Sequence, residues 1–343
     1  MVNIKDVRIS NSELKQSQSA SGLVAVFVGA TNGIGMGTLK QFTKLANAPK
    51  VYVVGRSRKA STLLLNELEA SNPQATVVFF ETEVSLMKNV DQICDEIKVK
   101  EKKLDILFLS CGYLTWDGRT ETIEGIDIPH ALRYYTRLRF TYNLLPLLTA
   151  SPSPRVISIL AGGREAEIDL TDLEVRNNFS GIKAMKNGTT QTTLAFEELV
   201  KSYPSITFIH KYPGFVDTGV VDRLMGTTKG IYALPATAFR WLLLPIINLF
   251  ATSVDEAGER GLFLATSARY PSAKPKAEGG LWVPVPKGVD VATSAVEGVY
   301  RVGADDATVK DTPALIAYRK ENAGKTVWEN TLAVWERALG RSG

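Results

Sequence analysis

Three glycines follow an apolar run near the N-terminus and form the pattern G-x-x-x-G-x-G within the stretch GATNGIGMG. Glycine at such a turn lets the chain bend tightly and lets backbone N–H groups approach a phosphate at the start of a helix. The context supports this interpretation, because a strand-like run precedes the turn and a helix-like segment follows it. The alternative is a turn that binds nothing. We predict a dinucleotide site formed by Gly29, Thr31, Asn32, Gly33, Ile34 and Gly35.

A basic stretch, GRSRKAS, follows the second strand-like run. An acidic residue at this place would meet the 2′-hydroxyl of an adenosine ribose, whereas a guanidinium suits a 2′-phosphate through paired N–H donors. The alternative is a solvated basic loop. Arg56 and Ser57 therefore favour NADP(H) over NAD(H) as the cofactor.

Elements that would position these motifs alternate along most of the chain. Short apolar runs rich in Val, Ile and Phe lack strict alternation, as expected for strands that are covered on both faces. Helix-like segments separate them, which predicts an α/β fold with a doubly wound parallel sheet. The predicted strands are residues 23–29, 51–55, 76–81, 104–110, 155–160 and 206–214, and the predicted helical segments are 38–46, 61–71, 90–103, 130–148 and 189–202.

The composition fits a globular protein in a reducing compartment. The chain has 343 residues, 45% of them hydrophobic, and a net charge of +4, which excludes a disordered protein. The small, scattered excess of basic residues does not indicate a nucleic-acid partner. Cys94 and Cys111 lie in apolar runs, so we expect no disulfide framework and a cytoplasmic protein. Two histidines and two cysteines spread apart predict no metal site.

No linker separates a second domain, so we predict one domain over residues 1–343 with C-terminal additions. Its core covers about 22–220, a substrate-lid or interface insertion covers 221–280, and a C-terminal extension covers 281–343 with a helix-like run at 329–339.

Residues 234–250 form the most apolar stretch of the chain. The stretch is shorter than the roughly 20 residues that span a bilayer, and it contains Arg240 and two prolines. We interpret it as a buried or oligomer-facing helix or the wall of a substrate pocket, with a membrane-surface role as the alternative. The polar N-terminus has no apolar h-region, so we expect no secretory signal.

The glycine turn and three later motifs together resemble the short-chain dehydrogenase/reductase family over residues 22–220. The motifs are Glu83-Val84, LSCG ending at Gly112, and PGFVDT at 213–218. In the family these positions hold the adenine, the adenosine ribose and the nicotinamide side of the cofactor, on a Rossmann sheet. The resemblance therefore assigns to the cofactor Glu83, Val84, Ser110, Gly112, Pro213, Gly214, Val216 and Thr218.

Two further stretches, GRTETIEGID and LRYYTRLRFTYNLLPLL, resemble a fungal branch of the family that is common in secondary-metabolite pathways. That branch includes reductases of indole-alkaloid assembly, some of which also guide a Diels–Alder ring closure. The resemblance implies a bulky, apolar small-molecule substrate and a homo-oligomer, either a dimer or a tetramer.

The four catalytic positions of the family, Asn, Ser, Tyr and Lys, do not hold their usual residues here. Counted from neighbouring motifs, these positions fall near Arg133 for Asn, Leu160 or Ala161 for Ser, Gly181 for Tyr and Met185 for Lys. We therefore predict a degenerate catalytic set.

Residues 179–183, FSGIK, look like the family's Tyr-x-x-x-Lys motif with a phenylalanine in first place. The register places the tyrosine position about two residues later, so we interpret the match as a near-coincidence. Gly181 and Phe179 are then predicted to border an enlarged substrate pocket, and Lys183 is a displaced candidate for contact with the nicotinamide ribose.

The missing phenol bears on the reaction. In ketone reduction, hydride reaches carbon while oxygen gathers negative charge, and a tyrosine proton and a serine hydrogen bond serve that oxyanion. An iminium ion already carries positive charge, so its reduction to a neutral amine needs no proton in that step. A nearby carboxylate and close placement help instead. The sequence thus favours an iminium ion or a similarly activated double bond as the hydride acceptor.

Polar candidates come from segment 130–148 and from the segment after strand 155–160, which both border the nicotinamide in this fold. Arg133 and Arg137 are four residues apart and share one helix face. We predict an Arg137–Asp172 pair at the substrate, with a structural salt bridge as the alternative. The catalytic candidates are Arg133, Tyr134, Arg137, Asp169 and Asp172.

Four further residues have separate expectations. Trp116 follows the LSCG turn and either walls an aromatic substrate pocket or packs structurally. His210, in a predicted strand, is expected to be a satisfied core residue, and His130 is assigned no role. Tyr135, like Tyr134, is the proton donor if the enzyme reduces carbonyls.

We therefore expect an NADPH-dependent reductase of a bulky natural product, whose pocket also steers a cycloaddition if it follows the fungal branch. The alternatives are a carbonyl reductase with a replacement tyrosine and a redox-silent NADP(H)-binding scaffold or sensor.

Overall fold

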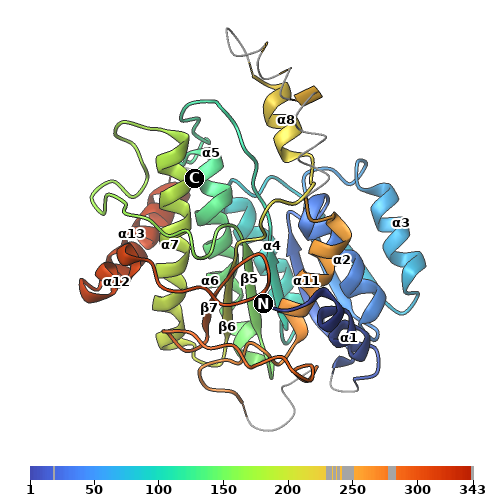
Figure 1. Ribbon diagram of the computed structural model, residues 1–343. Coiled ribbons are helices and arrows are strands. Elements are labelled where there is room, and N and C mark those ends of the chain that lie inside the picture. Colours follow the sequence, from blue (N-terminus) through green and yellow to red (C-terminus); the bar gives the residue numbers. More distant parts are fainter. Residues whose placement is uncertain are drawn as a thin grey trace.

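The computed structural model describes residues 1–17, 20–228, 251–276 and 283–340, with the single positions 234, 237, 240 and 241. Its centre is a seven-stranded sheet in the order β3-β2-β1-β4-β5-β6-β7 (Figure 1). Every neighbouring pair of strands is parallel, which confirms the predicted doubly wound sheet. The strands are β1 (Val24–Val28), β2 (Lys50–Gly55), β3 (Thr76–Glu81), β4 (Ile106–Leu109), β5 (Arg155–Ile159), β6 (Thr207–Lys211) and β7 (Val299–Val302).

The six predicted strands are all present, because their unbroken apolar runs suit a sheet with two covered faces. Every residue of β1, β4, β5 and β6 is buried. β7 was not predicted, since its four residues, VYRV, are too few for a periodic signal. It pairs with β6 through Ile209 and Tyr300, so the segment that we predicted as an extension completes the sheet.

Helices cover both faces of the sheet, each over its own apolar cluster (Figure 1). One face carries α1 (Ile4–Leu14), α2 (Gly33–Leu45), α3 (Thr62–Ser71) and α11 (Val254–Thr266). The other carries α4 (Met87–Lys100), α6 (Thr136–Ala150), α7 (Gly181–Ser202) and α13 (Ala323–Gly340). Shorter helices are α5 (Ile128–His130), the π-helical turn η2 (Ala131–Tyr135), α8 (Val220–Gly226) and α12 (Pro313–Lys320).

Helix α11 lies within residues 221–280, which we predicted to be a lid or interface insertion. It is instead part of the core, because Leu262, Phe263 and Leu264 are all fully buried. Gly258 of α11 crosses Gly37 of α2 so closely that a Cβ on Gly258 would lie 2.4 Å from the Gly37 carbonyl carbon. This contact fixes α11 against the helix that follows the glycine turn.

Among the described helices, none is both long and apolar enough to cross a membrane. The apolar stretch 234–250 lies outside the described residues, apart from the four single positions.

Candidate active site

The glycine turn lies between β1 and α2, at the carboxyl ends of β1, β2 and β4. Gly29 has a φ of 79°, and a Cβ there would lie 2.5 Å from backbone atoms of Cys111. Gly33 has a φ of 59°, and a Cβ on Gly35 would lie 2.2 Å from the hydroxyl oxygen of Ser110. The chain therefore has room only for glycine at these positions, as the sequence pattern predicted.

The turn opens onto the first turn of α2. Asn32 caps this helix, since its side-chain oxygen accepts the Gly33 N–H at 2.8 Å. N–H groups in the first helical turn have no acceptor within the helix, and the helix dipole adds partial positive charge. Thr31 packs at the end of β2, where its methyl group would lie 2.7 Å from a Cβ on Gly55. This arrangement fits a pyrophosphate.

The basic loop begins where β2 ends. Arg56 and Arg58 are both exposed, and the Arg58 guanidinium lies 5.9 Å from the centre of the Phe79 ring. Ser57 accepts the backbone N–H of Ala60 at 3.2 Å, which fixes the loop before α3. Two guanidinium groups are thus placed beside the turn, where a 2′-phosphate could accept their N–H donors.

The other predicted cofactor positions lie along the same edge of the sheet. Ser110 donates to the carbonyl oxygens of Val28 at 3.3 Å and Gly29 at 3.2 Å. The Glu83 carboxylate accepts the N–H of Ser85, and Val84 is buried. The segment after β6 returns to the turn, because the Thr218 methyl would lie 3.0 Å from a Cβ on Gly33. That segment includes Pro213, Gly214 and Val216, and Gly112 follows β4.

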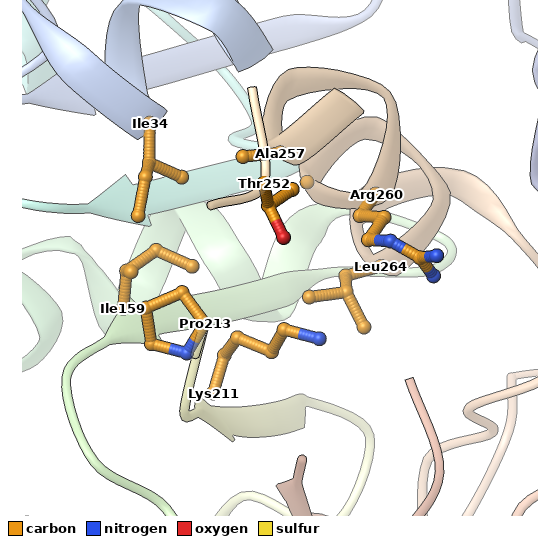
Figure 2. Close-up of a pocket in the computed structure, with 9 residues that line it drawn as sticks. Ile34, Ile159, Lys211, Pro213, Thr252, Ala257, Arg260 and Leu264 are labelled. Carbon is orange, nitrogen blue, oxygen red and sulfur yellow. The ribbon is translucent and has the colours of Figure 1, made fainter. Parts of the chain in front are cut away.

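A narrow crevice lies between Ile34 of α2, Ile159 of β5 and Pro213 after β6 (Figure 2). It has room for about one water molecule. Two of its lining residues, Lys211 and Arg260, were not predicted, because their positions depend on contacts between residues far apart in the sequence. Lys211 and Arg260 both pair with the buried Asp306, at 2.5 and 2.6 Å.

Asp306 thereby joins β6, α11 and the loop after β7 beneath the crevice. Burial lowers the pKa of Lys211, and Asp306 opposes that shift. A lysine within the strand run ITFIHKYPG was the one signal that sequence offered for this cluster.

Arg137 lies between the carboxyl ends of β4 and β5 and is only 2% exposed. The predicted pair with Asp172 is wrong, and so is the alternative of a structural salt bridge. The Arg137 guanidinium donates to the carbonyl oxygens of Leu109, Cys111, Leu132 and Ile159 and to the Ser158 hydroxyl. Asp172 accepts the N–H groups of Arg176 and Asn177 in its own loop instead.

The two tyrosines cannot donate protons to a substrate, because both are fully buried. The Tyr134 hydroxyl lies 2.7 Å from Thr331 of α13, and burial raises its pKa further above the ordinary value. Tyr135 packs edge-on against Tyr134 and His130 in the same core. The helical spacing of the tyrosines could not predict their burial, because Thr331 of α13, which contacts Tyr134, is almost 200 residues away in the sequence. The nearby Arg133 donates to the carbonyl of Tyr113 at 3.3 Å.

Asp169, Asp172 and Lys183 line a second, open hollow of about 470 Å³. Lys183 donates to the Asn178 carbonyl at 3.1 Å, and Asp169 accepts from both the N–H and the hydroxyl of Thr171. This hollow shares no lining residue with the crevice of Figure 2. The structure therefore brings these three candidates together, but not with Arg137.

Phe179 and Gly181 lie at the start of α7. Phe179 is half-buried, and Gly181 is the first helical residue, where a Cβ would meet no atom within 4 Å. Gly181 is exposed, and the enlarged substrate pocket expected at the place of the family's tyrosine stays a prediction.

His210 is a satisfied core residue, as predicted, but it also belongs to a network that the sequence did not predict. Its Nε2 accepts the N–H of Ala161 at 3.2 Å, and its Nδ1 lies 2.8 Å from the Thr193 hydroxyl. Thr193 in turn donates to Glu165 at 2.7 Å. Burial lowers the pKa of His210 to about 4, so the ring is neutral at pH 7. The network holds the segment after β5 at the crevice.

Trp116 is 62% exposed, and its indole N–H donates to the Thr228 hydroxyl at 3.0 Å. The contact joins the loop after β4 to the end of α8. Trp116 is therefore a surface residue above the site rather than a core tryptophan.

Comparisons with known proteins agree with this geometry. Residues 23–165 match the family described as short chain dehydrogenase. Oxidoreductase AN1596 of Emericella nidulans is 37% identical over 350 residues, which cover 99% of this chain and 100% of that protein. Oxidoreductase andH of Emericella variicolor is 32% identical over 345 residues, with 99% and 98% covered.

Among solved structures, YwfH, described as an NADPH dependent reductase involved in bacilysin biosynthesis, superposes with a TM-score of 0.55. The sequences are 16% identical, and the match covers 85% of this chain and 100% of that one, which supports the fold. On the sequence matches, the glycine turn and the sheet order together, the chain belongs to the short-chain dehydrogenase/reductase family.

Proposed function

We propose that this protein is an NADPH-dependent reductase of a bulky, largely apolar intermediate of secondary metabolism. The observation that carries the proposal is the glycine turn, which has room only for glycine and opens beside the exposed guanidinium of Arg56. The similar oxidoreductases from two Emericella species and the bacilysin reductase support the reductase class.

NADPH fits the residues present. The N–H groups of the first turn of α2 would hold its pyrophosphate, and Arg56 with Ser57 would hold its 2′-phosphate. The cofactor supplies a hydride when bound. The remaining requirement is an acceptor that lies over the carboxyl ends of β4 and β5.

Apolar side chains at this edge support a bulky apolar substrate. Tyr113, Leu114 and Trp116 after β4 and Phe215 after β6 are all large and at least 36% exposed. Exposed apolar side chains that gather at one place commonly mark a binding surface. The exposure of Trp116 also argues against a scaffold or sensor whose cleft is filled by that residue.

The hydride acceptor in this proposal takes no proton from a tyrosine, since Tyr134 and Tyr135 are buried in the core. A conjugated carbonyl fits, because hydride adds to its carbon terminus and water can protonate the resulting enolate. The replacement-tyrosine carbonyl reductase loses its proposed donor.

An iminium ion is the second candidate acceptor, and the same missing phenol favours it. An iminium ion would need a carboxylate near it. Asp169 and Asp172 do not provide one beside Arg137, because both line the separate hollow. A following Diels–Alder ring closure remains a prediction, which analysis of the reaction products would test.

The cofactor assignment is tested by reversing one charge. Arg56→Glu should weaken NADPH binding by at least about tenfold, as expected for loss of a charge-assisted contact, and should leave NADH binding nearly unchanged. Lys59→Glu is the matched control, because it removes the same charge from the same exposed loop. Titration of cofactor fluorescence measures both constants. Equal losses in the two variants would contradict the assignment.

The acceptor is tested with a substrate panel. A bulky conjugated ketone, the matching saturated ketone and a cyclic iminium salt are each incubated with NADPH, and its oxidation is followed by absorbance. We expect the conjugated ketone to turn over fastest. Turnover of the saturated ketone alone would sink the proposed acceptor class, and an inert panel with bound NADPH would favour the scaffold.

A further inference from the structure

Arg137 is a buried cation whose hydrogen-bond acceptors are all neutral. Its donors reach four backbone carbonyls and the Ser158 hydroxyl at 2.5 to 3.1 Å. None of the ion pairs within 4.0 Å among the described residues includes Arg137, whereas the buried Arg301 pairs with Glu165. Buried charge without a counter-charge is uncommon because it is costly.

The positive charge on Arg137 persists. Burial lowers its pKa, but a guanidinium is too basic to lose its proton near neutral pH. Carbonyl dipoles stabilise the cation without cancelling its net charge. The site therefore has a fixed positive potential that is strengthened by the low dielectric around it.

This positive potential acts at the carboxyl ends of β4 and β5, on the other side of β1 from Arg56. The glycine turn follows β1, and β1 lies between β2 and β4 in the sheet. If Arg56 at the end of β2 takes the adenosine phosphate, the other half of the dinucleotide must extend over β4 and β5. Arg137 donates hydrogen bonds to the carbonyls of Leu109 and Cys111 at the end of β4 and to the carbonyl of Ile159 at the end of β5.

We propose that Arg137 makes this part of the site select against positively charged occupants, so that it holds NADPH more tightly than NADP⁺ and accepts neutral double bonds in preference to iminium ions. The inference rests on the proposed function and names its substrate class. The nicotinamide ring is neutral in NADPH and positive in NADP⁺, whereas their phosphates are the same. The ratio of their dissociation constants therefore isolates the effect of ring charge.

The substrate follows the same electrostatic rule. In a conjugated carbonyl, hydride forms the new C–H bond, the double-bond electrons move to oxygen, and water protonates the product, while NADPH becomes NADP⁺. No cation needs to enter beside Arg137. An iminium substrate would bring a second positive charge next to the fixed one.

The experiment compares NADPH and NADP⁺ binding to the wild-type chain and three variants. Arg137→Gln removes the charge and keeps two N–H donors, and Arg137→Lys keeps the charge. Arg139→Gln is the matched control on the same helix, since the charge of Arg139 is already balanced by Asp91 in a partly buried ion pair. Fluorescence titration gives the NADPH constant, and displacement of NADPH gives the NADP⁺ constant.

We expect the wild type, Arg137→Lys and Arg139→Gln to bind NADPH roughly tenfold more tightly than NADP⁺, the scale of unit charges about 10 Å apart in protein. In Arg137→Gln the ratio should fall toward one. An unchanged ratio in folded Arg137→Gln overturns the inference. If Arg137→Gln does not fold, equal binding of NADPH and NADP⁺ by the wild type overturns it instead. Failure of the wild type to bind either form overturns the proposed function itself.

Discussion

His210 shows how one buried side chain can set the backbone at the end of β5. Because its Nε2 accepts the N–H of Ala161, the neutral ring must carry its proton on Nδ1 and donate it to Thr193. A Cβ on Gly162 would lie 1.9 Å from the His210 carbonyl oxygen, so the chain passes β6 at close range here. The segment that follows β5 is therefore held against β6 by the His210 ring and by close backbone packing.

The neutral state of His210 predicts a loss of stability in acid. Burial lowers its folded-state pKa to about 4, against an ordinary 6.5, and the nearby Arg137 and Arg301 contribute while Glu165 opposes. Stability is therefore full above about pH 6.5 and falls as the pH drops toward 4, by an amount of the order of 3 kcal/mol. Urea unfolding at pH 7 and pH 5 measures the loss.

His210→Gln should be less dependent on pH over this range, because the amide cannot take up the proton. Some dependence should persist, since burial also lowers the pKa of His130 to about 3. A variant with the full wild-type pH dependence would show that His210 is not the titrating group.

At the scale of single residues, the sequence predicted what local geometry demands and missed what tertiary contacts decide. Gly29 and Gly35 could be predicted, because a tight turn excludes any other side chain. The partners of Arg137 could not, because its acceptors are backbone carbonyls from two strands and leave no sequence pattern. Helix spacing could not show that Thr331 of α13 lies against the Tyr134 hydroxyl in the core.

Among the elements, the crossing of α2 and α11 depends on two facing glycines. Gly258→Ala would place a Cβ 2.4 Å from the carbonyl carbon of Gly37, so we expect a loss of about 1–3 kcal/mol in the free energy of unfolding. Chemical denaturation with an unchanged m-value measures this loss. The crossing also orients the helix at the glycine turn, so NADPH affinity should fall in the same variant.

Gly181→Ala is the matched control, because it makes the same change in a helix where the added Cβ meets no atom within 4 Å. It should be neutral or slightly stabilising, by about 0.5 kcal/mol, since alanine loses less backbone entropy than glycine. Similar changes in both variants would mean that the close contact between Gly258 and Gly37 does not set the effect.

The six apolar strands and the helices between them were predictable because each carries its own periodic signal. β7 and α11 were not, because VYRV is short and α11 lies in a stretch where strands and helices cease to alternate. Both belong to the core only through partners that are distant in the sequence, β6 and α2.

Across the whole molecule, the two ends of the chain complete the two helical layers (Figure 1). Asn11 of α1 donates to the Glu259 carbonyl of α11 at 2.8 Å, and α13 packs against α7 and α4 on the other face. The predicted C-terminal extension is therefore required for a closed core. The homo-oligomer predicted from the sequence remains a prediction, which light scattering of the purified protein would test.

The contribution of α13 is concentrated in Trp335, which is 1% exposed and packs against Tyr142 and Trp328 beneath the Arg139 guanidinium. Trp335→Ala should lower the free energy of unfolding by about 3–5 kcal/mol, because the large cavity cannot close fully. Leu332→Ala, at a 37% exposed position of the same helix, should cost under about 1 kcal/mol. Urea denaturation of both variants compares them directly. Equal, small losses would show that α13 is an accessory helix and that the sheet and its other helices fold without it.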